Sequence, residues 1–131
     1  MANAIQAVET AVFAALSAAI TAAPVYQHPP ENAPWPLVIV GDIDGATPIG
    51  FDDDDDDDRI VPLQIAVVTE GRERAPCIAL VGQVVSALRN NILIEAGFTI
   101  RVLLESETVN NTDDGKGYVG IVQFRVFALG D

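Results

Sequence analysis

The clearest structural pattern in the chain lies at residues 98–129, FTIRVLLESETVNNTDDGKGYVGIVQFRVFAL. Apolar and polar side chains alternate with a period of two in both of its halves, which is the pattern of strands that bury one face. The joining segment SETVNNTDDGKG, at 106–117, is full of turn-forming residues. We therefore expect two long antiparallel strands with a flexible, protruding tip, and an apolar face turned toward helices that consists of Phe98, Ile100, Val102, Phe124 and Val126.

Helical periodicity marks the segment just upstream, CIALVGQVVSALRN at 77–90. Its apolar residues recur at steps of three and four, and Pro76 suits the first turn of a helix. A second amphipathic pattern covers 3–22 and has to stop before Pro24, because a proline disfavours helix in the residue before it. The sequence therefore predicts two amphipathic helices.

Two further strands are indicated between these helices. LVIVG at 37–41 and RIVPLQIAVVTE at 59–70 are apolar runs of the strand type. Pro62 has no N–H to donate, so an edge or a bulge is expected there. The order α-β-β-α-β-β predicts an α+β fold in a single domain over 1–131, with an antiparallel four-stranded sheet and two helices packed on it.

Two connections stand out between the predicted elements. PVYQHPPENAPWP at 24–36 is too rich in proline for a helix or a central strand. Its Trp35 suits either a plug that anchors this connector against the sheet or an anchor residue of a protein interface. The connection at about 42–58 is longer than a hairpin needs and is strongly acidic.

Composition excludes several classes of function. Half of the residues are hydrophobic, which predicts a packed core, and the formal net charge is −12. The seven basic residues are scattered, so a protein that reads DNA or RNA directly is not expected. No apolar run is long enough for a bilayer, and the apolar N-terminal segment is interpreted as a helix of the mature protein rather than a signal peptide. A soluble, intracellular protein is expected.

Nothing in the chain forms a catalytic constellation. His28 is the only histidine and lies in the proline-rich connector, where a surface position is expected. Cys77 is the only cysteine and has no basic partner in the pattern, so it is interpreted as a small buried residue. The glycine-rich motifs of nucleotide sites and of hydrolases do not occur. We expect no enzymatic activity and no cofactor.

The acidic connection ends in seven consecutive aspartates. Calcium loops need acidic residues at alternate positions, a central glycine and a distal glutamate, and this run lacks that spacing. Neighbouring carboxylates repel one another, which favours a hydrated loop. A solvated loop without an ordered metal ion is therefore expected, with weak and non-specific binding of divalent cations as the alternative, at Asp52, Asp53, Asp54, Asp55, Asp56, Asp57 and Asp58.

The order of these elements resembles a known family. The opening helix, VYQHPPENAPWPLVIVG, LQIAVVTEG, CIALVGQVVSALRN and GIVQFRVFAL are together similar to the tail-completion, or tail-terminator, proteins of tailed phages and gene transfer agents. The resemblance covers nearly the whole chain and lies in the order and spacing of the elements, since no single motif is diagnostic.

The resemblance implies a structural virion protein, assembled in the bacterial cytoplasm and located at the junction of tail and neck. It implies a homo-hexameric ring that caps the tail tube protein, docks the head-side neck or adaptor protein and lets DNA pass without binding it. The aspartate run is then expected on the channel or rim. Contacts with a neighbouring subunit or ring are expected from the tip, at Asn110, Asn111, Thr112, Asp113, Asp114 and Lys116.

Two other classes of function stay open from the sequence. The first is another neck or tail-tube component of the same particle. The second is a small acidic module that binds divalent cations or mimics a nucleic acid in front of a basic partner. Co-purification with tube or portal would separate the first class, and a calcium-dependent shift in melting of a monomer would favour the second.

Overall fold

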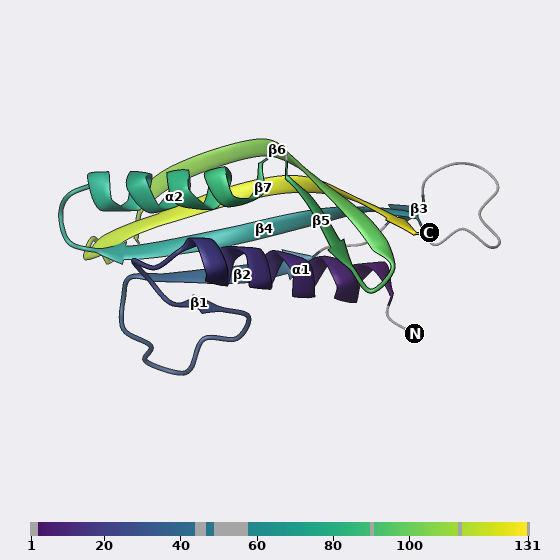
Figure 1. Cartoon of the computed structure of the whole chain (residues 1–131). Coiled ribbons are helices and arrows are strands. Elements are labelled where there is room, and N and C mark those ends of the chain that lie inside the picture. The colour runs from purple at the N-terminus through teal and green to yellow at the C-terminus, as the bar shows by residue number, and fades with distance from the viewer. Residues whose placement is uncertain (1–2, 44–46, 49–57, 90, 113, 131) are drawn as a thin grey trace.

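Two helices lie on one side of a long, twisted sheet (Figure 1). The computed structural model describes residues 3–43, 47–48, 58–89, 91–112 and 114–130. In chain order, the elements are α1 (Ala4–Ala19), β1 (Val25–Tyr26), β2 (Leu37–Ile43), β3 (Thr47–Pro48), β4 (Arg59–Glu70), α2 (Ala75–Leu88), β5 (Ile92–Glu95), β6 (Phe98–Asn111) and β7 (Gly117–Gly130).

Three long strands form the centre of the sheet. β6 and β7 pair as an antiparallel hairpin from Phe98 opposite Gly130 to Asn111 opposite Tyr118, with one register shift after Leu104. β4 pairs antiparallel with the other edge of β7 over its whole length. The long hairpin predicted from the alternation at 98–129 is therefore confirmed.

The predicted four-stranded antiparallel sheet is wrong. Among the described residues the sheet has seven strands, in the order β1-β2-β4-β7-β6-β5, with β3 paired to β4 beside β2. It is mixed, because β1 runs parallel to β2. The four expected strands correspond to β2, β4, β6 and β7, and the fold remains α+β.

The three strands that the sequence analysis missed are short. β1 lies inside the proline-rich connector, and β3 lies inside the acidic connection. Two residues cannot show a period, so both strands depend on the edge that they pair with. β5 has four residues and joins β6 through Ala96 and Gly97, whose φ angles are 52° and 86°. Two successive positive φ values are typical of a tight two-residue hairpin turn.

Pro62 lies in the interior of β4, where the neighbouring strand changes register. The pairing of β2 with β4 shifts between Val40 and Ile43, and Ile43 pairs with Leu63, next to Pro62. On the other side of β4, Pro62 is opposite Arg125 of β7. The proline is thus accommodated beside a β-bulge of its partner strand, which is one of the two situations expected for a strand proline.

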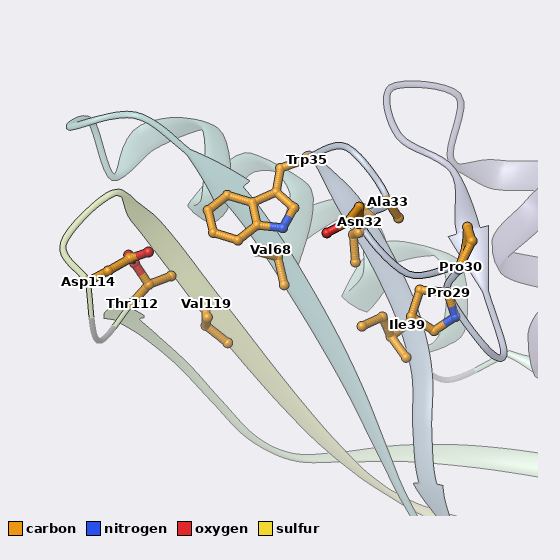
Figure 2. Close-up of a pocket in the computed structure, with 11 residues that line it drawn as sticks. Pro29, Pro30, Asn32, Ala33, Trp35, Ile39, Val68, Thr112, Asp114 and Val119 are labelled. Atoms are coloured by element: carbon orange, nitrogen blue, oxygen red, sulfur yellow. The ribbon is translucent and has the colours of Figure 1, made fainter.

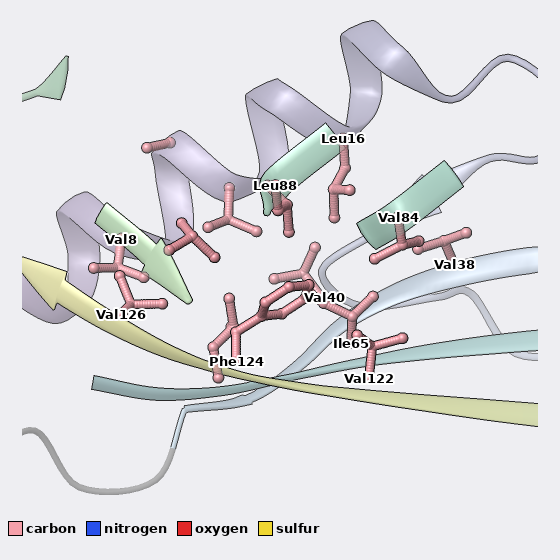
Figure 3. Close-up of a cluster of buried hydrophobic side chains, with 14 of the residues drawn as sticks. Val8, Leu16, Val38, Val40, Ile65, Val84, Leu88, Val122, Phe124 and Val126 are labelled. Carbon is pink, nitrogen blue, oxygen red and sulfur yellow. The ribbon is translucent and has the colours of Figure 1, made fainter. Parts of the chain in front are cut away.

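Both helices cover the same face of the sheet and share one core with it (Figure 3). Phe124 lies at the centre of this core, between residues of both helices and of three strands. The buried residues of α1 are mostly alanines and valines, and its Ile5 is 40% exposed. The residues expected to face the helices are all buried: Phe98, Ile100, Val102, Phe124 and Val126.

Glycines allow β7 to approach its neighbours closely at two points. A Cβ atom added to Gly120 would lie 2.4 Å from Val81 Cγ2 of α2. A Cβ atom added to Gly117 would lie 2.1 Å from the carbonyl oxygen of Thr69 in β4. Both distances are far below van der Waals contact. The absence of a side chain at Gly120 and at Gly117 therefore allows α2 and the end of β4 to pack this closely against β7.

Candidate functional site

The face of the sheet opposite the helices carries a hollow near one end. Its volume is about 520 Å³, and it lies where β2, β4 and β7 meet the proline-rich connector (Figure 2). Apolar groups form most of its wall, and two polar residues of the hairpin tip close one side. We call it the tryptophan hollow, and it is lined by Pro29, Pro30, Asn32, Ala33, Trp35, Leu37, Ile39, Val68, Thr112, Asp114 and Val119.

Strand register explains why these residues meet. Leu37 pairs with Val68 and Val68 pairs with Val119, so three strands place side chains on the same face at the same level. The connector passes over this end of the sheet, and Trp35 stands above Val68 (Figure 2). Trp35 is half-buried and lies outside the buried core, so it forms a wall of the hollow instead of filling the core.

The hairpin tip is held in shape by its own hydrogen bonds. The Thr112 hydroxyl donates to Asp114 Oδ1 at 2.7 Å, and the Lys116 N–H donates to the same oxygen at 3.0 Å. Those two donors lower the pKa of the Asp114 carboxyl, with the Lys116 N–H as the larger cause. Gly115 follows with a φ of 72°, which suits glycine. Asp114 is therefore ionised at neutral pH, at the rim of the hollow.

The tip is also tied to the turn between β4 and α2. The Gly71 N–H donates to the Lys116 carbonyl at 2.8 Å, and the Tyr118 hydroxyl donates to the Arg72 carbonyl at 3.3 Å. The Arg74 guanidinium lies over the Tyr118 ring, 5.6 Å from its centre. The tip thus forms one end of the molecule together with this turn, where the sequence suggested a flexible protrusion.

The expected contact residues of the tip lie close together in the structure. Asn110 and Asn111 end β6, and Thr112, Asp114 and Lys116 belong to the turn that follows. Asp113 lies outside the described residues. Two of the described tip residues, Thr112 and Asp114, line the hollow, and the predicted contact of the tip with another subunit stays a prediction.

Of the seven aspartates, the structure describes one. Asp52 to Asp57 lie outside the described residues. Asp58 Oδ1 accepts a hydrogen bond from the Gly130 N–H at 2.7 Å, and the Asp58 carbonyl accepts one from Arg59 Nη1 at 2.8 Å. Asp58 thus joins the start of β4 to the end of β7, at the end of the molecule away from the hairpin tip (Figure 1).

Neither residue considered for catalysis lies in a reactive setting. His28 is exposed on the connector. Cys77 is a buried residue in the first turn of α2, and this burial raises the pKa of its thiol, an effect that the neighbouring Thr69 side chain opposes. The Thr69 hydroxyl itself is buried and lacks a hydrogen-bond partner of good geometry among the described residues. A thiol with a raised pKa is a poor nucleophile.

Two negative findings concern the described residues alone. No group of three or more His, Cys, Asp or Glu side chains among them could hold a metal ion. In the same part of the chain, neither helix is long and apolar enough to cross a membrane.

Sequence reasoning missed the outer strand β5 and its exposed side chains. Ile92 is 59% exposed and Ile94 is 77% exposed, while Leu93 between them packs against the core. The alternation in ILIE, followed by Ala-Gly, is the signal that indicates a short strand and a tight turn. Two exposed isoleucines on an edge strand mark a surface that other chains can pair with or cover.

Comparison with known proteins confirms the family resemblance that the sequence suggested. The family model for tail completion protein gp17 matches residues 10–128. The chain belongs to the tail completion protein gp17 family. It is thus a tail completion protein. None of the curated protein sequences matches it.

Solved structures show where this tail completion fold recurs. One similar chain comes from the virion of a native gene transfer agent particle, with 17% sequence identity, a TM-score of 0.78, and 97% of this chain and 98% of that chain covered. Another is the gp17 protein of bacteriophage SPP1, with 22% identity, a TM-score of 0.57, and 98% and 90% of the two chains covered. Both similarities extend over nearly the whole described fold of this chain.

Proposed function

We propose that this tail completion protein forms a closed homo-hexameric ring that caps the tail tube and docks the head-side neck or adaptor protein. The observation that carries the proposal is the match of almost the entire chain to a chain of a gene transfer agent virion, together with the family. The ring assembles in the bacterial cytoplasm and takes its place at the junction of tail and neck. Isolated subunits are free to be monomeric before assembly.

The charge of the chain suits a ring through which DNA passes. Each copy carries a formal net charge of −12, and the seven basic residues are spread over the sequence. A wall of the same sign as the DNA backbone gives phosphates no counterion sites and does not retain them. The ring therefore acts as a passage and an adaptor, and its function lies in its contacts with other proteins.

A ring requires two different surfaces on each subunit that fit one another. Such a heterologous contact, repeated by a rotation that closes, gives a finite ring. The hairpin tip, the tryptophan hollow and the outer strand β5 are the exposed features that such contacts could use. The tip and the hollow adjoin one another, and β5 lies along the other end of β6, so the chain offers two separate surfaces, as a heterologous contact requires.

Imaging and native mass spectrometry of whole particles test the ring. We expect six copies of this chain in one ring between tail tube and head-side neck. A chain that stays monomeric inside the assembled particle would overturn the proposal. Co-purification with the tail tube alone or with the portal side alone would place the protein elsewhere in the same particle.

A second test concerns the hairpin tip. Shortening the loop between β6 and β7 should leave the fold intact and impair assembly, because the tip residues lie outside the buried core. Unfolding curves report the fold, and the yield of complete particles reports assembly. Equal losses in both measurements would contradict an assembly role for the tip.

A further inference from the structure

Two apolar surfaces lie apart from one another on the sheet. One is the tryptophan hollow, which spans β2, β4 and β7 at the end that carries the hairpin tip. The other is on β5, the last strand in the order, which pairs with β6 at the end away from the tip, and it consists of Ile92, Ile94 and Arg101. We call this second surface the isoleucine edge.

The isoleucine edge is one continuous surface by strand pairing. Arg101 of β6 is directly opposite Ile92 of β5, so their side chains point to the same face of the sheet. Ile94 follows two residues later in β5 and therefore points the same way. Ile100, which alternates with Arg101, is fully buried under the helices, so the isoleucine edge belongs to the helix-free face.

The isoleucine edge is unfavourable for an isolated chain. Two isoleucines that are 59% and 77% exposed stand on a strand that pairs with β6 on one side only, among the described residues. Exposed apolar edge strands are sites of association with other chains. Burying the exposed parts of these two side chains against another chain would favour association. The exposed Ile78, at 52%, lies on a helix and offers no strand edge.

The tryptophan hollow matches this edge in polarity and in charge. Its walls are mostly apolar, and at about 520 Å³ it is as large as pockets that hold drug-sized ligands, which span roughly 300–1,000 Å³. Asp114 stands at its rim as a carboxylate. Arg101 is exposed and makes no ion pair with another described residue. Two copies of this chain repel one another, because each carries a formal net charge of −12. A contact between Arg101 of one copy and Asp114 of the next would bring opposite charges together and would favour this arrangement of the two surfaces.

We propose that the isoleucine edge of one copy docks in the tryptophan hollow of the next copy, with Arg101 next to Asp114, and that this contact is the subunit interface of the ring. The inference rests on the proposed ring and adds the two surfaces that join. Because the surfaces are different and lie at different ends of the long strands, each subunit uses both of them at once. The contact is therefore head to tail, as closure of a ring demands.

Cysteine cross-linking within assembled particles tests this contact directly. The double variant Ile94→Cys with Val119→Cys, oxidised mildly, should give a ladder of covalent multimers up to the hexamer on a non-reducing gel. The native Cys77 is fully buried and is left in place. The matched control, Ile78→Cys with Val119→Cys, should give no ladder, because Ile78 is equally an exposed isoleucine but lies on α2.

Substitutions give a second measurement that does not depend on a disulfide. Ile94→Ser should weaken the association of subunits in assembling particles by at least about tenfold, the effect expected when one apolar side chain is lost from the contact. Trp35→Ala should do the same from the other side of the contact. Ile78→Ser should leave self-association unchanged, and the melting temperatures of Ile94→Ser and Ile78→Ser should stay close to that of the wild type.

The possible outcomes separate this inference from the proposed ring. A hexamer of the correct mass without the Ile94→Cys/Val119→Cys ladder would overturn the interface and leave the ring standing. A Trp35→Ala variant that still forms rings but no longer retains the tail tube would assign the hollow to another protein and also overturn the interface. Absence of any ring in the particle would overturn both proposals.

Discussion

The two faces of the central strands differ in what covers them. In β4, the residues that face the helices, Val61, Leu63, Ile65 and Val67, are at most 2% exposed. Their neighbours on the opposite face, from Pro62 to Val68, are half-buried or exposed. The same strand thus alternates between a packed core and an open surface, as the period-two pattern of its sequence requires.

This difference suggests that the two faces of the sheet have different roles. Residues on the covered face are locked by both helices and determine whether the chain folds. The open face is apolar near the tryptophan hollow and at the isoleucine edge, where the structure offers no cover from its described residues. Substitutions on the first face should act on stability, and those on the second should act on assembly.

The largest effect is expected from a pair of phenylalanines in β7. Phe124 is fully buried on the covered face, and Phe127 is half-buried on the open face. Phe124→Ala should cost about 3–5 kcal/mol of unfolding free energy, because it removes a large side chain from the centre of the core. Phe127→Ala should cost less than about half as much. Urea unfolding of both variants measures this, and equal losses would remove the distinction between the faces.

A smaller effect is expected where β7 approaches α2. Gly120→Ala should destabilise the protein by about 1–3 kcal/mol, since its Cβ would overlap Val81 Cγ2 and overpacking costs about that much. Gly82→Ala on α2 is the matched control, because nothing lies within 4 Å of its added Cβ. It should stabilise the helix by up to about 1 kcal/mol. Thermal melting distinguishes the two, and a tolerated Gly120→Ala would mean that α2 is free to move away from the sheet.

Strict local patterns predicted the covered face well. β4 has the bounds that its apolar run predicted, Arg59–Glu70, and all five residues expected to face the helices from β6 and β7 are buried. Such positions are predictable because burial on one face forces an alternation that a single sequence displays. The aromatic, proline-rich and strand segments also carried the resemblance to the tail completion family, which the comparison confirmed.

The arrangement of residues on the open face could not be predicted, because it depends on contacts between segments that are far apart in the sequence. Trp35 and Thr112 are far apart in the chain and meet only because β2, β4 and β7 are neighbours in the sheet. β1 and β3 have two residues each, and they are strands only through the partners that they find. The sequence therefore indicated Trp35 and the tip residues as candidates, but it could not predict that they lie at the same hollow.

A polar residue at the rim tests whether the open face is irrelevant to stability. In Asp114→Asn the charged acceptor of the Thr112 hydroxyl and the Lys116 N–H is lost. The folded-state pKa of Asp114 is lowered, so its contribution to stability is present above its ordinary pKa and disappears as the pH falls through the lowered value. We expect a small decrease in melting temperature at neutral pH that vanishes in strong acid. A pH-independent difference would mean that the carboxylate charge is not the cause.

The smallest effect on folding is expected from the aspartate run. Replacing Asp52 to Asp57 with alternating Ser and Asn, while keeping Asp58 as the acceptor for the Gly130 N–H, should leave the unfolding curve and the mass of the ring unchanged. Buried carboxylates without partners cost several kcal/mol each, so the fold cannot depend on placing six of them in a core. Their charge acts within about 8–10 Å at physiological salt, so any defect should be confined to the retention or passage of DNA or to docking of a basic partner.

The control Asp58→Ala removes the hydrogen bond to Gly130 and should lower the melting temperature slightly. A six-residue variant that fails to fold, or a wild-type chain that binds one calcium ion at micromolar affinity, would show that the run is an ordered site instead of a solvated loop.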